Sequence, residues 1–259
     1  AFLAQVLPGR CIQPDTMKSM SKGPQCGPFF MKTNQILENV KRVNGIVIYD
    51  PIGKCEIIRV PTFLNKDDCK RLINLVAEKA DKSIHLDFAS GKANPHGAIR
   101  NSNTRVISPT CEYILDHLIR IADILCTPET HAEPVNLIHY DQGGYFEQHL
   151  DAYSEIHFAM AEYGSSDRLT DLISAGNRTW TAMIFLNENF SGGETVFPRL
   201  GINLIPREGD LICWKNTVDS NPILTSLHSG AKVTDGSKFV AVIPFRERPC
   251  SQEDPSYYI

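Results

Sequence analysis

The part of the chain after Pro128 is a succession of short β-type runs, and this pattern constrains the fold more than any other feature. Residues rich in Gly, Pro, Asn or Asp separate most of the runs. The runs cover residues 135–140, 145–150, 179–187, 194–197, 202–205, 210–215, 224–228 and 238–245. Several short strands with regular turn signals are typical of a sandwich or a jelly roll. We therefore predict that this part of the chain is a β domain.

The spacing of apolar residues in the first half of the chain predicts helices that would support this β domain. Residues 66–79 carry apolar side chains at helical spacing, and Asn65 is suited to cap the first turn. Residues 110–125 have the strongest helical pattern, with one side formed by Tyr113, Ile114, His117, Leu118, Ile121 and Leu125. A short helix is expected over residues 34–43. The predicted fold class is α+β, mainly β, with a core supported by N-terminal helices.

Composition divides the chain into four segments. We expect an N-terminal arm over residues 1–60 with a candidate hairpin (45–49 with 55–60), and a helical support region over residues 61–133. The core is expected over residues 134–247 and a C-terminal tail over residues 248–259. Residues 152–177 are polar and are predicted to form a long flexible insertion, of the kind that often acts as a lid. Residues 100–104 are predicted to be a solvated turn.

Charge and cysteine content exclude several classes of function. The net charge of the 259 residues is −4 and there is no long basic run, so we expect no nucleic-acid partner. No apolar run approaches the roughly 20 residues that a membrane span requires, so no span is expected. The eight cysteines form no Cys-x-x-Cys pair, so their spacing argues against a zinc site. Cys11 and Cys26 are the best disulfide candidates, and eight free thiols are the alternative.

His149-x-Asp151 is the first element of a candidate metal site. Residues two apart on a strand point to the same face, so an imidazole and a carboxylate here can bind one metal ion from one side. A second histidine would complete the facial triad that leaves open positions on Fe(II) for a cosubstrate and oxygen. The alternative is a chance match, because a His-x-Asp pair alone has little specificity.

His228 and Lys238 are the later residues that could complete this site. His228 is the one histidine in a late β-type run. A three-residue loop at residues 234–236 would pair His228 with Val242, so that His228 and Lys238 face the same way about 13 Å apart. This spacing suits a metal-bound dicarboxylate whose far end pairs with the lysine. A two-residue loop would place them on opposite faces, and a solvated edge-strand lysine remains the alternative reading of Lys238.

Further motifs surround these residues in a fixed order. They are Tyr140-x-x-Gly143, Arg178-x-x-Thr181, Gly192-Gly193-Glu194-Thr195-Val196-Phe197-Pro198, Pro206-x-x-Gly209-Asp210, Ser226-Leu227-His228 and Gly236-x-Lys238. Together with His149-x-Asp151, this series resembles the prolyl 4-hydroxylase family of Fe(II)/2-oxoglutarate-dependent dioxygenases. The resemblance covers residues 61–247 and is densest over residues 134–247. It implies that the β domain is a double-stranded β-helix (jelly roll).

The resemblance also implies an activity and its site residues. The expected reaction hydroxylates peptidyl proline with O2, and 2-oxoglutarate is decarboxylated to succinate and CO2. By resemblance, the Fe(II) ligands are His149, Asp151 and His228. The residues that hold 2-oxoglutarate are Lys238, which would pair with its C5 carboxylate, together with Tyr140 and Thr195. Arg178 matches an arginine that lines the peptide groove, and the expected partner is a proline-containing peptide or protein.

Two positions depart from the family pattern on the side of the substrate. The family commonly has tyrosine three residues before the first histidine ligand, where this chain has Phe146, and the neighbouring Tyr145 would face the other way. The family often has an aromatic residue where this chain has Pro244. A 2-oxoglutarate dioxygenase acting on another side chain or a small molecule is therefore the alternative, and a non-catalytic jelly-roll binding module is a third reading.

The remaining expectations concern the reductant and the compartment. The family implies ascorbate as a further cofactor. Relatives with an arm and cysteines of this kind are mostly proteins of the endoplasmic reticulum, so the resemblance implies the endoplasmic reticulum or secretory pathway, with the cytoplasm as the alternative. Asn-x-Ser/Thr sequons occur at Asn177 and Asn189, but a chain of this length would contain one or two by chance.

Overall fold

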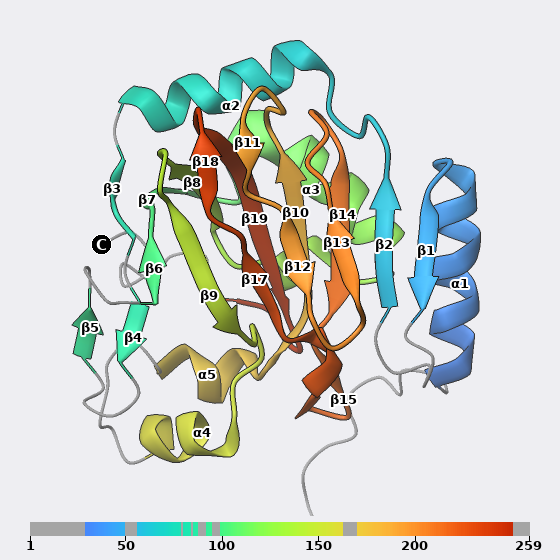
Figure 1. Ribbon diagram of the computed structural model, residues 1–259. Coiled ribbons are helices and arrows are strands. Elements are labelled where there is room, and N and C mark those ends of the chain that lie inside the picture. Colours follow the sequence, from blue (N-terminus) through green and yellow to red (C-terminus); the bar gives the residue numbers. More distant parts are fainter. Residues whose placement is uncertain are drawn as a thin grey trace, which may run out of the picture.

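Two facing antiparallel sheets form the body of the molecule in the computed structural model, which describes residues 29–49, 56–78, 80–83, 85–87, 92–94, 99–162 and 170–250 (Figure 1). The large sheet has the order β1 (Ile46–Tyr49), β2 (Glu56–Val60), β14 (Leu211–Lys215), β10 (Arg178–Phe185), β19 (Lys238–Arg246), β8 (Val135–Tyr140), β7 (Asn103–Ile107) and β3 (Asp81–Lys82). The small sheet has the order β13 (Ile202–Leu204), β12 (Thr195–Phe197), β17 (His228–Gly230), β9 (Tyr145–His149) and β6 (Arg100–Asn101). The predicted mainly β jelly roll is confirmed.

Three short strand pairs accompany the two sheets. They are β4 (His85–Asp87) with β5 (Lys92–Asn94), β11 (Ser191–Gly192) with β18 (Val233–Asp235), and β15 (Thr217–Val218) with β16 (Asn221–Pro222). The predicted hairpin of residues 45–49 and 55–60 forms as β1 and β2, and β2 pairs with β14, so the hairpin extends the large sheet. The N-terminal strands are thus part of the sandwich.

The large sheet is buried on both faces, and β10 shows how. Ala182 and Ile184 belong to the core shared with the helices, whereas Met183 and Phe185 belong to the core between the two sheets. Because successive side chains on a strand point to opposite faces, covering both faces requires an uninterrupted apolar run. This explains why the run at residues 179–187 lacks the alternation expected of a half-exposed strand.

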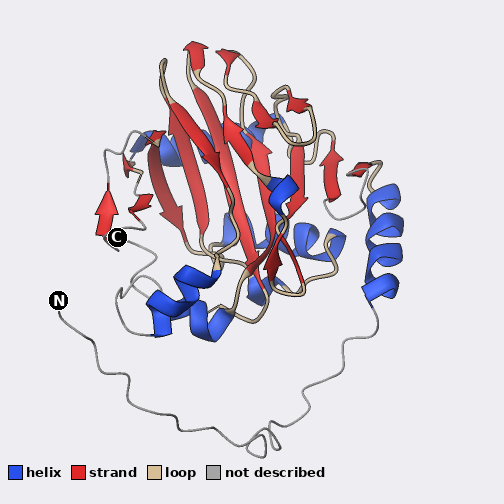
Figure 2. Ribbon diagram, turned by 60° about the horizontal axis from the view of Figure 1, so that its bottom comes forward, coloured by secondary structure: helices blue, strands red, loops and turns tan. Residues whose placement is uncertain are grey.

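The helices cover the outer face and one edge of the large sheet (Figures 1 and 2). They are α1 (Phe29–Arg42), α2 (Lys66–Glu78) and α3 (Glu112–Ile124). The cap predicted for α2 is confirmed, because Oδ1 of Asn65 accepts a hydrogen bond of 2.9 Å from the backbone N–H of Asp68. Two details were wrong. Tyr113 is 53% exposed and lies off the buried side of α3, and α1 begins five residues before residue 34, directly after Pro28, a residue type suited to helix starts.

Two segments predicted to be loops have regular structure. Residues 152–177 contain α4 (Glu155–Glu162) and α5 (Thr170–Ala175), which lie together at one end of the sandwich (Figure 2) and bury Ala161 and Leu172 in a small apolar cluster of their own. Residues 100–104 lie mostly in β6 and β7. The hydroxyl of Ser102 is buried and lies 2.7 Å from that of Ser83. The segment is polar because its side chains form hydrogen bonds inside the fold, and from the sequence alone this polarity looked like that of a solvated turn.

The hairpin predicted between His228 and Lys238 does not form. Residues 224–226 are a 3-10 helix (η4, Leu224–Ser226) rather than part of a strand, and β17 begins at His228. β17 pairs with β12 and β9 in the small sheet, whereas β19 pairs with β10 and β8 in the large sheet. The chain therefore crosses from one sheet to the other between these residues, by way of β18, which pairs with β11.

The remaining expectations concern cysteines and membrane spans. The candidate disulfide residues Cys11 and Cys26 lie outside the described residues, while Cys69 and Cys213 are buried thiols. Within the described part of the chain, no helix combines the length and the apolar character needed to cross a bilayer. The other short helix, η2 (Glu129–His131), leads into β8.

Candidate active site

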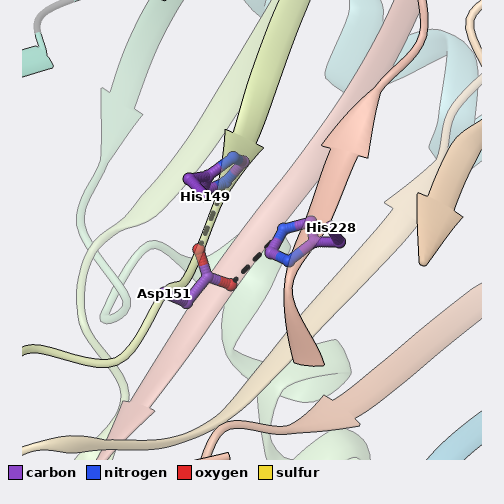
Figure 3. Close-up of side chains that lie close together, drawn as sticks. All are labelled: His149, Asp151 and His228. Atoms are coloured by element: carbon purple, nitrogen blue, oxygen red, sulfur yellow. Dashed lines mark ion pairs between the residues drawn. The ribbon is translucent and has the colours of Figure 1, made fainter. Parts of the chain in front are cut away.

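His149, Asp151 and His228 lie together at one end of the small sheet (Figure 3). His149 ends β9 and His228 begins β17, and the two residues are directly opposite in the antiparallel register. Asp151 follows β9 by two residues. Its Oδ1 lies 3.5 Å from Nε2 of His149, and its Oδ2 lies 3.9 Å from Nε2 of His228. The ligand atoms of the three residues all lie within 4.8 Å of one another.

Backbone carbonyls fix the orientation of both imidazoles. Nδ1 of His149 lies 2.8 Å from the carbonyl oxygen of Glu147, and Nδ1 of His228 lies 3.0 Å from that of Ser226. A carbonyl oxygen only accepts, so each Nδ1 carries the proton and donates it. Each Nε2 then presents a lone pair toward Asp151, which is the arrangement found around histidine ligands of metals.

The electrostatics of the cluster favour metal-binding protonation states. Burial and, to a smaller extent, the neighbouring His149 lower the pKa of His228 to about 4, so the ring is neutral at pH 7. Burial alone raises the pKa of the Asp151 carboxyl, but His228, His149 and Arg178 outweigh burial and hold this pKa well below its usual range. Two imidazoles and one carboxylate are the donor set of a facial triad, and the residues present therefore fit Fe(II).

The cluster opens into a cavity of about 630 Å³ between the two sheets. This is within the usual size range of small-molecule sites. Tyr140, Thr195 and Lys238, the residues expected to hold a cosubstrate, all line this cavity. Lys238 and Tyr140 are opposite one another on β19 and β8, and Thr195 is in register with Gly230 on β17. The structure thus brings the expected cosubstrate residues to the same cavity as His149, Asp151 and His228. The hairpin from which we predicted that Lys238 and His228 face the same way is nevertheless absent.

Lys238 is a buried ammonium that forms no salt bridge with a described carboxylate, although the charge of Glu194 acts to raise its pKa. It is 3% exposed, and its Nζ donates a hydrogen bond of 2.7 Å to the carbonyl oxygen of Gly193. The rings of Tyr140 and Phe185 lie 5.3 and 5.6 Å from this nitrogen. Burial lowers its pKa to about 8. A buried cation in an otherwise apolar wall is suited to bind an anion that enters the cavity.

Gly193 makes room for this lysine. Its φ is +70°, and a Cβ at this position would lie 2.8 Å from the ring of Phe190 and 3.2 Å from Cδ of Lys238. Any larger residue would be strained and would push against the lysine stem.

Arg178 lines the cavity, but its guanidinium is engaged by a partner that the sequence did not reveal. It donates to both carboxylate oxygens of Glu133 at 2.6 and 2.7 Å, and it lies over the ring of Tyr153, 5.0 Å from its centroid. Burial raises the pKa of Glu133, while Arg178 and Arg246 reverse this and lower it. Glu133 was missed because a buried acidic residue 45 positions away in sequence has no local signature.

Phe146 forms part of the cavity wall beside the metal cluster. Its ring stacks on that of His149 at a centroid distance of 3.6 Å, and the guanidinium carbon of Arg100, a residue of β6, lies 4.7 Å from the Phe146 ring centroid. Arg100 also lines the cavity and was overlooked, because its segment looked like a solvated turn. Met183, Trp214 and Pro244 line the cavity as well, whereas Phe185 lies against Lys238.

The comparison with family models gives one match. Residues 135–246 match the model described as "2OG-Fe(II) oxygenase superfamily". The matched range contains every residue of the metal cluster and the three cosubstrate-side residues.

Curated relatives extend the comparison beyond this range. The chain is 30% identical over 181 residues to "Putative prolyl 4-hydroxylase" of Acanthamoeba polyphaga mimivirus, a match that covers 64% of this chain and 69% of that protein. It is 29% identical over 197 residues to "Probable prolyl 4-hydroxylase 10" of Arabidopsis thaliana, covering 68% of this chain. The chain spans 64% of the length of this Arabidopsis relative.

Solved structures share the fold. A viral collagen prolyl hydroxylase from Paramecium Bursaria Chlorella virus-1, crystallised as a 2OG complex, matches with a TM-score of 0.55 and 24% identity, over 73% of this chain and 95% of that one. A prolyl-4-hydroxylase from Pseudomonas putida matches with a TM-score of 0.50 and 16% identity, over 84% of this chain and 100% of that one.

Proposed function

The chain belongs to the prolyl 4-hydroxylase family of 2OG-Fe(II) oxygenases, and from this premise we propose that it hydroxylates proline residues in a peptide or protein. The cosubstrates are 2-oxoglutarate and O2, and the products include succinate and CO2. The observation that carries the proposal is the meeting of a His-Asp-His cluster and a buried lysine in one cavity.

Each part of the cavity has a distinct task in this proposal. His149, Asp151 and His228 would hold Fe(II), which together with 2-oxoglutarate supplies the activation of O2 needed to hydroxylate a C–H bond. Lys238 would bind the C5 carboxylate of 2-oxoglutarate. This carboxylate would give the buried ammonium an anion at salt-bridge distance. Tyr140 is buried beside it, 5.3 Å from ring centroid to Nζ, and its hydroxyl would donate to the same carboxylate.

The substrate side of the cavity has a different character from the cosubstrate side. Phe146 and Arg100 would form the apolar and the charged part of the wall on this side, with the Phe146 ring stacked on His149 and the Arg100 guanidinium over the ring. Arg178 is held by Glu133 and would form a fixed wall of the peptide groove. Apolar walls with few fixed polar groups exclude water from the reacting carbon and orient it.

A second candidate function is supported by the two departures from the family pattern. Phe146 and Pro244 both line the cavity, and the family commonly has tyrosine at the first position and often an aromatic residue at the second. These changes alter the substrate side and leave the metal and cosubstrate residues in place. A 2-oxoglutarate dioxygenase acting on another side chain or a small molecule is therefore the alternative.

Succinate release separates the candidates. The protein is incubated with Fe(II), ascorbate and 2-oxoglutarate, with and without a proline-rich peptide, and the peptide is analysed for the addition of one oxygen atom. Succinate that depends on the peptide, with oxygen on proline, supports the proposal. Turnover without any effect of proline peptides favours the alternative, and no turnover with no iron binding would sink both. His149→Ala should abolish turnover, while His117→Ala, on α3 outside the cavity, is the matched control.

Ascorbate and the secretory pathway complete the proposal. Ascorbate would act as the reductant that restores iron after uncoupled turnover, as the family implies. A secretory location has a direct test in the sequons. Asn177 is fully buried and both ends of its amide are hydrogen-bonded, whereas Asn189 is exposed. A glycan on Asn189 that an N-glycosidase removes, absent in Asn189→Gln, would support the secretory pathway over the cytoplasm.

A further inference from the structure

We propose that Thr181, supported by Asn216, is a positioning residue that reserves one oxygen of Asp151 for the metal and so keeps three metal positions open. This inference rests on the proposed function only in requiring that the cluster binds a divalent metal.

The contacts form a short chain that leads away from the metal cluster. The Thr181 hydroxyl lies 2.6 Å from Oδ2 of Asp151, and Nδ2 of Asn216 lies 2.8 Å from Oγ1 of Thr181. Thr181 and Asn216 are both fully buried. Thr181 is on β10 of the large sheet, while Asp151 follows β9 of the small sheet. The chain of contacts therefore holds the carboxylate from the opposite layer of the sandwich.

The direction of each hydrogen bond follows from the available protons. An ionised carboxylate only accepts, so the single hydroxyl proton of Thr181 is donated to Asp151. Oγ1 of Thr181 can then only accept from its other neighbour, and the amide N–H of Asn216 supplies that proton. This fixes the orientation of the Asn216 amide, since its oxygen could not take this place.

The same orientation leaves Oδ1 of Asn216 buried without a protein partner among the described residues. A buried acceptor without a partner costs about 1–3 kcal/mol of folding free energy. A residue chosen only for packing would avoid this cost. The Asn216 amide leaves its oxygen unsatisfied while its N–H supports Thr181, which donates to Asp151. This arrangement indicates that Asn216 serves the orientation of Asp151.

The consequence concerns how Asp151 binds the metal. Its Oδ2 accepts a hydrogen bond from Thr181, while Oδ1 accepts none from a described residue and lies 3.5 Å from Nε2 of His149, which carries no proton. A carboxylate held in this way is directed to bind through one oxygen. Two histidines and one carboxylate oxygen would then hold the metal, and its remaining positions would stay available for 2-oxoglutarate and O2. Bidentate binding by Asp151 would remove the position for O2.

The test compares metal binding in three variants of the cosubstrate-free protein. Thr181→Val keeps the shape and removes the hydroxyl, Thr181→Ser restores a hydroxyl, and Thr179→Val is the matched control. Thr179 is on the same strand and donates to the carbonyl oxygen of Phe245 at 3.1 Å, away from Asp151. Co(II) is used as the probe, because its visible absorption reports the number and geometry of its ligands. Thermal unfolding of the metal-free variants verifies that each is folded.

We expect Thr181→Val to weaken Co(II) binding by about 10- to 100-fold, the usual effect of losing such a partner, and to change the Co(II) spectrum. Thr181→Ser should restore most of the affinity and the native spectrum, and Thr179→Val should match the native protein in both. A folded Thr181→Val protein with native affinity and spectrum overturns the inference, even if the native enzyme turns over. Conversely, native protein that binds Co(II) but hydroxylates no peptide contradicts the proposed function and leaves this metal-binding comparison intact.

Discussion

Replacing Lys238 with methionine removes the buried ammonium while keeping a side chain of similar length. Burial lowers the pKa of Lys238 from 10.5 to about 8. At about 1.4 kcal/mol per pH unit, this corresponds to roughly 3 kcal/mol by which folding disfavours the charged form. The substitution also removes the hydrogen bond to Gly193, worth about 1.5–3 kcal/mol for a charged donor. At pH 7 the two effects nearly offset, so the substitution should change the unfolding free energy little.

The pH dependence of this difference is the sharper test. Above pH 8 the folded protein releases the Lys238 proton, while the unfolded chain keeps it up to pH 10.5. The unfolded state then binds more protons, so the stability contributed by this residue rises with pH between these two values. Relative to Lys238→Met, the native protein should gain up to roughly 3 kcal/mol between pH 7 and pH 10.5. Urea unfolding of both cosubstrate-free proteins across this range measures the gain, because other titrating groups cancel in the difference.

Binding of 2-oxoglutarate should weaken as the pH rises, whereas the stability contributed by Lys238 increases. Loss of a buried charge partner costs about 2–5 kcal/mol, so Lys238→Met should raise the KM for 2-oxoglutarate at least about thirtyfold. In the native enzyme this KM should rise as pH increases through 8, because the free site loses the ammonium that pairs with the carboxylate. A stability difference that stays constant from pH 7 to pH 10.5, or a KM unchanged by the substitution, would refute the reasoning.

Three further substitutions test other parts of the structure. Glu133→Ala leaves the buried Arg246 and the partly buried Arg178 without the Glu133 carboxylate, and it should cost about 3–5 kcal/mol in urea unfolding; a cost below 1 kcal/mol would contradict a structural role for these ion pairs. Arg100→Ala removes the cation over Phe146 and should raise the KM for the peptide about fivefold, as expected for a contact of roughly 1 kcal/mol. An effect confined to the KM for 2-oxoglutarate would contradict this assignment. Asn65→Ala removes the cap of α2 and should cost about 1 kcal/mol, measured as a lower midpoint of unfolding without loss of turnover.

The sequence predicted those features that depend on local patterns. The cap at Asn65, the helix that follows it and most strands of the core are encoded by residues a few positions apart. His149 and Asp151 are also local, because two residues of spacing place them on one side even though β9 ends at His149. Motif order then indicated which other histidine and which lysine belong to the cavity.

Features that depend on the pairing of distant strands could not be predicted. The hairpin between His228 and Lys238 was a reasonable local solution, but β17 and β19 belong to different sheets. Both residues nevertheless face the cavity, because the two sheets enclose it from opposite sides. Arg100 and Glu133 were missed for the same reason. Each acquires its role from a partner brought near by tertiary packing, and neither has a pattern of its own in the sequence.

The position of the metal ligands on two neighbouring strands has a consequence for the stability of the folded protein. Both histidines are carried by the small sheet, and the group that fixes Asp151 is carried by the large one. A metal ion held by His149, Asp151 and His228 would cross-link β9 and β17 within the small sheet, so its binding free energy would also oppose the separation of these strands. Amide hydrogen exchange should therefore slow on β9 and β17 when metal is added, well before any substrate is present. Metal supply would then govern the lifetime of the folded protein as well as its turnover.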